Sequence, residues 1–99
     1  MAFVQIIEFR TSKFDEMQRL GNEWEAAAGD ESKARRRVLC RDRSDDGHYL
    51  NIVFFDSYDE AMENSNHPVT QEFSQKMMAL SDGAPVFYDL DVVEDRAGS

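Results

Sequence analysis

The chain has 99 residues, of which 41% are hydrophobic and 31% charged, and its formal net charge at pH 7 is −9. This length predicts a single domain, residues 1–99, and the composition is that of a globular protein rather than a disordered one. The acidic charge is spread along the chain and would repel phosphate backbones, so nucleic acid is not expected as a partner.

The sequence also argues against a secreted or membrane-bound protein. The single cysteine, Cys40, cannot form an intramolecular disulfide, which favours a reducing compartment. The apolar start of the chain is interrupted by Glu8 and no basic residue precedes it, unlike a signal peptide. No apolar run approaches the roughly 18–20 residues that a membrane span needs. We therefore expect a cytoplasmic protein without a membrane partner.

The first expected element is a strand over residues 2–10, which is rich in β-branched and aromatic residues. With a period of two, its apolar residues fall on both faces, with Phe3, Ile7 and Phe9 on one and Val4 and Ile6 on the other. A strand of this kind belongs in the middle of a sheet that is covered on both sides.

An amphipathic helix is expected next. A capping-box-like sequence at residues 12–15 begins it, and Gly29 and Asp30 end it where a left-handed cap is expected. Its apolar stripe consists of Phe14, Met17, Leu20, Trp24, Ala27 and Ala28. Trp24 could stack on a ligand, but a tryptophan on an apolar helical stripe is more typical of a core residue.

A hairpin is expected next, because the turn sequence at residues 44–47 separates two strand-like segments, 34–43 and 48–55. The second segment is apolar on both faces and should also be central. The first carries a row of arginines on one face, Arg35, Arg37, Arg41 and Arg43. Such charge suits an edge strand. We expect this row to lie near the acidic face of the last strand, Asp89 and Asp91, across a dimer. The alternative is that the row faces water or binds an anionic ligand.

A second helical region starts at a capping box formed by Ser57 and Glu60. Pro68 should break it, because proline disfavours helical geometry in the residue before it. Pro68 can also be the first residue of a new helical segment, with Asn66 or His67 as its cap.

A last strand over residues 85–93 carries Asp89 and Asp91 on one face and should be an edge strand. The order strand-helix-strand-strand-helix-strand, with right-handed crossovers, puts the first and third strands in the centre. We therefore predict an α+β, ferredoxin-like fold with a four-stranded antiparallel sheet. Two helices cover one face of such a sheet. A second copy of the chain is the simplest cover for the other apolar face, which predicts a homodimer of the dimeric α/β-barrel type.

Residues 54–93 combine a strand, an S-x-x-E helix start, a helix broken around a proline and a final strand. In this layout the segment resembles the antibiotic-biosynthesis-monooxygenase-like branch of the dimeric α/β-barrel superfamily, and the whole chain resembles it in topology. The superfamily that this resemblance implies includes cofactor-free oxygenases of aromatic polyketides, haem-degrading enzymes, lactone isomerases and members of no known activity.

The haem-degrading branch is disfavoured, because Ser74 and Asn64 stand where the resemblance would place its proximal histidine and its tryptophan. No haem or other cofactor is therefore expected. Gly-rich phosphate loops and nucleophile-elbow motifs are missing from the sequence. His48 and His67 lie on different expected elements, so no metal site is expected either.

Cofactor-free oxygenases hold an electron-rich phenol in a pocket with a few polar groups. The equivalents that the resemblance implies here are Gln5, Tyr49, Asn51 and Tyr88 for substrate binding and His67 for catalysis. A histidine near the mouth of such a pocket could donate or accept a proton. The alternative for His67 is that it caps the new helical segment or lies in solvent.

Two functions stay open at this level. One is a non-catalytic dimer with a small-ligand-binding or accessory role. The other is a cofactor-independent monooxygenase-like enzyme that acts on an aromatic, polyketide-like small molecule. The enzyme needs an internal cavity with converging polar groups, whereas the non-catalytic protein predicts an interior filled by apolar side chains.

Overall fold

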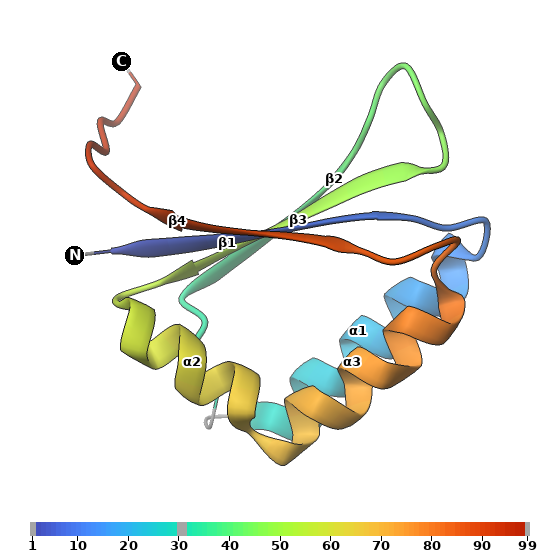
Figure 1. Ribbon diagram of the computed structural model, residues 1–99, viewed down its shortest axis with the longest axis horizontal. Coiled ribbons are helices and arrows are strands. Elements are labelled where there is room, and N and C mark those ends of the chain that lie inside the picture. The colour runs from blue at the N-terminus through green and yellow to red at the C-terminus, as the bar shows by residue number, and fades with distance from the viewer. Residues whose placement is uncertain (1, 30–31, 99) are drawn as a thin grey trace.

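The computed structural model describes residues 2–29 and 32–98. In these residues three helices lie on one face of a four-stranded antiparallel sheet (Figure 1). The elements in chain order are β1 (Phe3–Arg10), α1 (Phe14–Ala28), β2 (Arg36–Arg41), β3 (His48–Phe55), α2 (Tyr58–Asn66), α3 (Pro68–Leu80) and β4 (Val86–Asp91). The strand order β2-β3-β1-β4 confirms the ferredoxin-like prediction, with the two doubly apolar strands in the centre.

The two faces of the sheet differ in what covers them. The buried residues of the central strands all have odd numbers and lie under the helices: Phe3, Phe9, Tyr49, Asn51, Val53 and Phe55. The even-numbered apolar residues Val4, Ile6, Leu50, Ile52 and Phe54 are only partly buried. We call the first surface the helix face and the second the open face.

The start of α1 corrects the sequence prediction. Within the described residues, Lys13 is the N-cap and makes no side-chain capping bond, so the capping box expected at Ser12 is not formed. The Oγ1 atom of buried Thr11 accepts a hydrogen bond from the Lys13 amide at 3.0 Å and donates one to the Leu80 carbonyl at 2.7 Å. This link to the end of α3 fixes the entry into the helix, and Ser12 stays exposed.

Helix α1 ends at the glycine that the sequence predicts, but without the left-handed helical cap that was expected. Gly29 has a φ of +51° and a ψ of −132°, and its amide donates to the Glu25 carbonyl. Glycine adopts positive φ without the steric cost that a Cβ brings. Asp30, the other residue expected to end this helix, lies outside the described residues. Ala27, expected on the apolar stripe, is exposed, so the stripe is narrower than predicted.

The second helical region breaks where the proline predicts it. Ser57 Oγ accepts from the Glu60 amide at 3.1 Å, which confirms this cap. His67 has extended backbone geometry and separates α2 from α3, which form two arms of a V below the sheet (Figure 1). Its Nδ1 atom accepts a hydrogen bond from the Val69 amide at 3.2 Å, and Pro68 begins α3. His67 is therefore the N-cap of α3.

Both edge strands are shorter than expected. The strand expected over residues 34–43 is β2, Arg36–Arg41, because the chain turns at Asp42, whose carboxylate accepts bonds from the Ser44 amide and hydroxyl. The last strand, expected over residues 85–93, is β4, Val86–Asp91.

Candidate functional site

The core under the helix face is divided into two clusters. One contains Phe3 and Ala61 near α2, and the other contains Phe9 and Met17 near the start of α1. Between them, the middle of the helix face carries the polar side chains Gln5 and Asn51. A cavity of about 420 Å³ lies over this polar middle, between the sheet and the helices α1 and α3. Ligand pockets commonly have volumes of about 300–1,000 Å³, so the space suits a small molecule.

The cavity wall is mainly apolar. Its apolar side chains are Ile7, Phe9, Met17, Leu39, Val53, Phe55, Phe73, Met77 and Phe87. Polar groups come from several elements, namely Gln5, Gln18, Asn22, Asn51, Asn64, Ser65, Thr70 and Ser74. An apolar wall with a few converging polar groups is the usual character of a small-molecule site.

Asn51 differs from the other polar residues of this wall in its hydrogen bonding. It lies on β3 directly opposite Ile7 of β1, and its side chain is 9% exposed. Its Oδ1 atom is buried and has no hydrogen-bond partner among the described residues. A buried polar atom without a partner costs about 1–3 kcal/mol, so native proteins keep few of them. A ligand hydroxyl donating to Oδ1 would remove this cost.

Gln5 shares the cavity wall but already has a partner. It lies on β1, and its Nε2 atom donates to Asp89 of β4 at 3.2 Å. This bond holds the Gln5 amide at the edge of the cavity on the β4 side. Phe87, also on β4, closes the same side and is 56% exposed, so this wall borders solvent.

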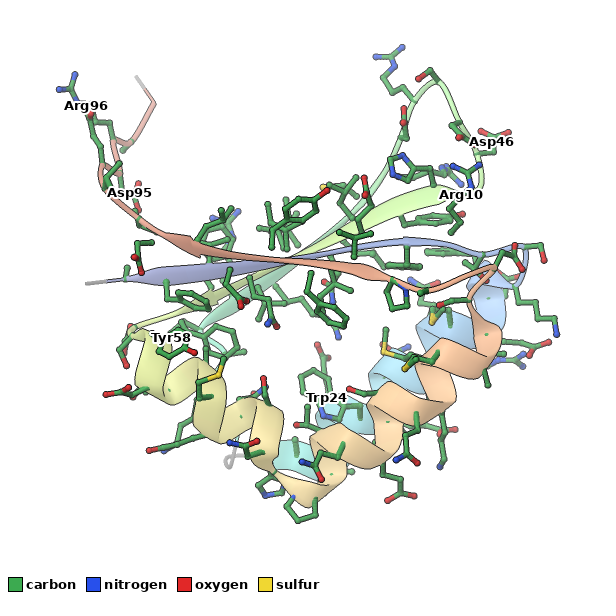
Figure 2. The ribbon with its side chains drawn as sticks, viewed as in Figure 1. Arg10, Trp24, Asp46, Tyr58, Asp95 and Arg96 are labelled. Atoms are coloured by element: carbon green, nitrogen blue, oxygen red, sulfur yellow. The ribbon has the colours of Figure 1, made fainter. Side chains whose placement is uncertain are left out.

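Trp24, Arg37 and Glu25 form the opposite side of the cavity. Trp24 points from α1 into the space between the helices and the sheet (Figure 2), and its Nε1 atom lies 3.4 Å from Oγ1 of Thr70, to which it donates. The Arg37 guanidinium lies over the Trp24 ring, 5.7 Å from its centroid, and forms an ion pair with Glu25 at 2.9 Å. These three side chains also line a smaller hollow of about 260 Å³ next to the cavity.

The four predicted substrate-binding residues divide between three places. Gln5 and Asn51 line the cavity. Tyr49 lies in the core, stacked with Phe14 at 4.6 Å between ring centroids and with Phe9 at 5.6 Å. Tyr88 projects from the open face, where its hydroxyl donates to Glu8 at 3.3 Å. Because Asn51 and Tyr88 lie on opposite faces of the sheet, they cannot line one cavity within one chain.

His67 lies at the junction of α2 and α3 as a helix cap. The described residues of the cavity wall include its neighbours Asn64 and Ser65 but not His67 itself. Ser74 and Asn64, which stand where a haem-degrading relative would have histidine and tryptophan, both line the cavity. Within the described residues, no group of three or more His, Cys, Asp or Glu side chains could hold a metal ion. No helix within residues 2–29 and 32–98 is long and apolar enough to cross a membrane.

Sequence reasoning missed the roles of Trp24, Arg37 and Thr70 in the wall. One signal was present, namely the isolated Gly21 within the helical pattern of α1. A Cβ added at Gly21 would lie 3.6 and 3.7 Å from the two terminal nitrogens of Arg37, so this glycine is where the arginine side chain passes the helix.

No family model matches the sequence, and no curated protein matches it. Solved structures are similar to it. A mutant of SnoaB, a cofactor-independent oxygenase from Streptomyces nogalater, has a TM-score of 0.82 at 16% identity, covering 95% of this chain and 95% of that chain. A protein from Caulobacter crescentus, provisionally named an antibiotic biosynthesis monooxygenase, has a TM-score of 0.81 at 20% identity, covering 94% of this chain and 91% of its own.

The protein Rv0793 from Mycobacterium tuberculosis is also similar, with a TM-score of 0.80 at 12% identity, and 98% of this chain and 100% of that chain are covered. At these identities the comparison establishes the fold. The chain has the ferredoxin-like fold of the antibiotic-biosynthesis-monooxygenase-like structures, which confirms the resemblance found in residues 54–93.

Proposed function

We propose that the protein binds a small aromatic molecule with a phenolic hydroxyl in this cavity and oxidises it with molecular oxygen, as a cofactor-independent monooxygenase-like enzyme. The observation that carries the binding step is the buried Oδ1 atom of Asn51, which lies in the mainly apolar wall and lacks a partner among the described residues. Phe55 and Phe73 offer aromatic surface to a flat ligand, and Asn51 offers the acceptor that its hydroxyl needs.

The oxidation step is supported by the similarity to SnoaB, which is a cofactor-independent oxygenase. Anthrone is a suitable model substrate, because its enol tautomer carries the aromatic hydroxyl that Asn51 would bind. In the reaction, O₂ forms a C–O bond at the carbon para to the hydroxyl, and the O–O bond of the resulting hydroperoxide breaks. One oxygen atom stays as the quinone carbonyl and the other leaves as water with two substrate hydrogens. The apolar wall would keep water away from the bound enol while O₂ reacts with it.

The binding step is tested with 2-naphthol by isothermal titration calorimetry. Asn51→Leu keeps the side chain near its size and removes the acceptor, so the Kd should rise about tenfold or more, as for loss of one buried hydrogen bond. Asn66→Leu, at an exposed position outside the cavity wall, is the matched control and should leave the Kd unchanged. Equal affinity of the wild type and Asn51→Leu would remove Asn51 from the site.

The oxidation step is tested by oxygen consumption with anthrone. The expected result is one O₂ consumed per anthraquinone formed, with a slower rate in Asn51→Leu. Tight 2-naphthol binding without any anthrone turnover would instead favour the non-catalytic, small-ligand-binding function.

We also propose that the protein is a homodimer in the cytoplasm. The support for the dimer is the open face, where Tyr88, Ile6, Ile52 and Val38 form one continuous row across all four strands. Val86 and Leu90 add exposed apolar surface on β4, with 46% and 43% of each residue accessible. A second copy of the same sheet would cover this surface, since monomeric proteins seldom expose such large apolar patches.

A further inference from the structure

We propose that Arg37 determines the specificity of the cavity by binding a carboxylate on the aromatic ligand. The inference rests on the proposed ligand binding and adds the chemical class of the ligand, an aromatic acid that also carries a hydroxyl. Asn51 and Arg37 both line the cavity, the first from a central strand and the second from an edge strand. One group would hold the hydroxyl and the other the acid.

The guanidinium of Arg37 is held in place by two residues of α1. It lies over the Trp24 ring, 5.7 Å from the centroid, and beside Gly21, whose missing side chain leaves the helix surface flat there. Its side chain is 25% exposed, which is low for an arginine on an edge strand. A guanidinium that is already oriented loses less conformational entropy when it binds a planar anion.

Glu25 is the present partner of Arg37, and it can be exchanged. The two side chains lie 2.9 Å apart, but that of Glu25 is 55% exposed. Ion pairs with an exposed partner contribute little, so a ligand carboxylate can replace Glu25 or share the five N–H donors of the guanidinium with it.

The Arg37 side chain is less exposed than that of Glu25, and this difference indicates which ligand charge the cavity prefers. Arg37 and Glu25 are the charged side chains in the described part of the cavity wall. An anion would displace Glu25, whose carboxylate can turn into water. A cation would have to pair with Glu25 and leave the more buried guanidinium without a carboxylate, which costs more. The cavity therefore favours an anionic ligand.

The test compares 6-hydroxy-2-naphthoic acid with 2-naphthol, which differ only in the carboxylate. In calorimetric titrations the wild type should bind the acid about tenfold or more tightly than the naphthol, as expected for one charge-assisted, bidentate pair. Arg37→Gln should remove this advantage, so that in the variant the Kd values of the acid and of 2-naphthol differ by no more than about twofold. High salt should weaken acid binding in the wild type and leave naphthol binding nearly unchanged.

Arg36→Gln is the matched control, because Arg36 lies over Phe54 on the open face and its loss changes the net charge equally. It should keep the preference for the acid. If the wild type binds 2-naphthol and binds the acid no more tightly than 2-naphthol, this inference is overturned and the proposed function still stands. Equal losses in Arg36→Gln and Arg37→Gln would also overturn it, as a general charge effect. Failure of both probes to bind would overturn the proposed function as well.

Discussion

The imidazole of His48 on β3 lies against the carboxylate of Glu8 on β1, with 2.9 Å between Nε2 and Oε2. Its other ring nitrogen, Nδ1, lies 2.9 Å from Oδ2 of Asp42 in the β2–β3 turn. The hydrogen bond to Asp42, followed by that to Glu8, raises the pKa of His48 above its ordinary value of 6.5. The same bond to His48, helped by bonds from Ser44, lowers the pKa of Asp42 to about 2. A protonated His48 thus joins the hairpin turn to the centre of the sheet.

This cluster predicts how stability depends on pH. The folded protein has the higher pKa at His48, so the contribution of His48 is complete below pH 6.5 and is lost as the pH rises through the raised value. Asp42 has the lower pKa when folded, so its contribution is present above 3.8 and is lost as the pH falls toward about 2. Stability should therefore be highest between about pH 4 and 6.5. The groups that face His48 are Glu8, Asp42, Tyr88 through Glu8, and Asp45 at longer range.

The measurement is the urea midpoint against pH at one protein concentration. His48→Asn should lower the midpoint most below pH 6.5, and the difference from the wild type should shrink as the pH rises through the raised pKa of His48. Asp42→Asn should show its largest loss between about pH 4 and 6.5, whereas Asp46→Asn, a charge change in the same turn, should not follow this profile. A difference between His48→Asn and the wild type that does not shrink as the pH is raised above 6.5 would contradict the role of a charged His48.

Two serines test the helix starts. Ser57→Ala removes the oxygen that accepts from the Glu60 amide and should lower the free energy of unfolding by about 1 kcal/mol. Ser12→Ala is the matched control, because Ser12 is exposed and the cap expected there is not formed; it should change stability by less than about 0.5 kcal/mol. Chemical denaturation of both variants measures this. Equal losses would show that Ser12 also caps a helix in solution.

These two serines also show why sequence reasoning succeeds at one helix and fails at the other. Both begin a serine-x-x-acid pattern, and local sequence does not separate them. The contact that decides the first case joins Thr11 to Leu80, 69 residues later in the chain. Patterns of period two and proline positions are local, so they predicted the strand order and the break at Pro68. Contacts between segments that lie far apart in the sequence cannot be predicted from such local patterns.

The site residues also differ in whether local sequence patterns or contacts between distant segments place them. Gln5 and Asn51 were expected from the family resemblance, and the alternation along β1 and β3 places both on the helix face. Tyr88 lies on the open face because it pairs with Ile6, and this register between β1 and β4 has no local signature. Arg37 was visible only as one of a row of arginines, since its contacts with Trp24 and Glu25 arise from packing of β2 against α1.

Replacing Gly21 by alanine tests the space between α1 and the Arg37 guanidinium through its effect on stability. It lies inside α1, where glycine costs about 1 kcal/mol relative to alanine. An added Cβ would make ordinary van der Waals contact with the Arg37 guanidinium, at 3.6 and 3.7 Å. Gly21→Ala should therefore raise the free energy of unfolding by about 0.5–1 kcal/mol, measured by urea denaturation. A loss of stability would mean that the guanidinium needs more space than the structure gives it.

His67 has two proposed roles that a pair of variants can separate. Its Nδ1 atom caps α3, and asparagine can replace it as a cap but cannot act as a proton acceptor at neutral pH. If His67 is the acid–base group of the proposed oxidation, both His67→Asn and His67→Ala should slow anthrone turnover about 10²-fold or more. If it only caps the helix, His67→Asn should keep both turnover and stability, and His67→Ala should lose about 1 kcal/mol of stability.

The last prediction concerns the open face. Ile52 lies in the middle of the row that runs from Val38 to Tyr88, and it is partly exposed in the single chain. If two sheets cover each other there, Ile52→Glu would bury two carboxylates against apolar side chains at the centre of the interface, and the free energy of burying unpaired charges would prevent association. By light scattering, the wild type should have twice the chain mass of 11.4 kDa, and Ile52→Glu should have the mass of a single chain.

Gln75→Glu, at an exposed position on α3, introduces the same charge and should remain dimeric. Circular dichroism establishes whether Ile52→Glu is folded, and Tyr88→Glu at the edge of the sheet is the second variant if it is not. Because association stabilises the folded chain by mass action, the Tm of a dimeric wild type should also rise with protein concentration, whereas that of a folded monomeric variant should not. A wild type of 11.4 kDa at micromolar concentration would show instead that the open face stays uncovered, and the row from Val38 to Tyr88 would need another explanation.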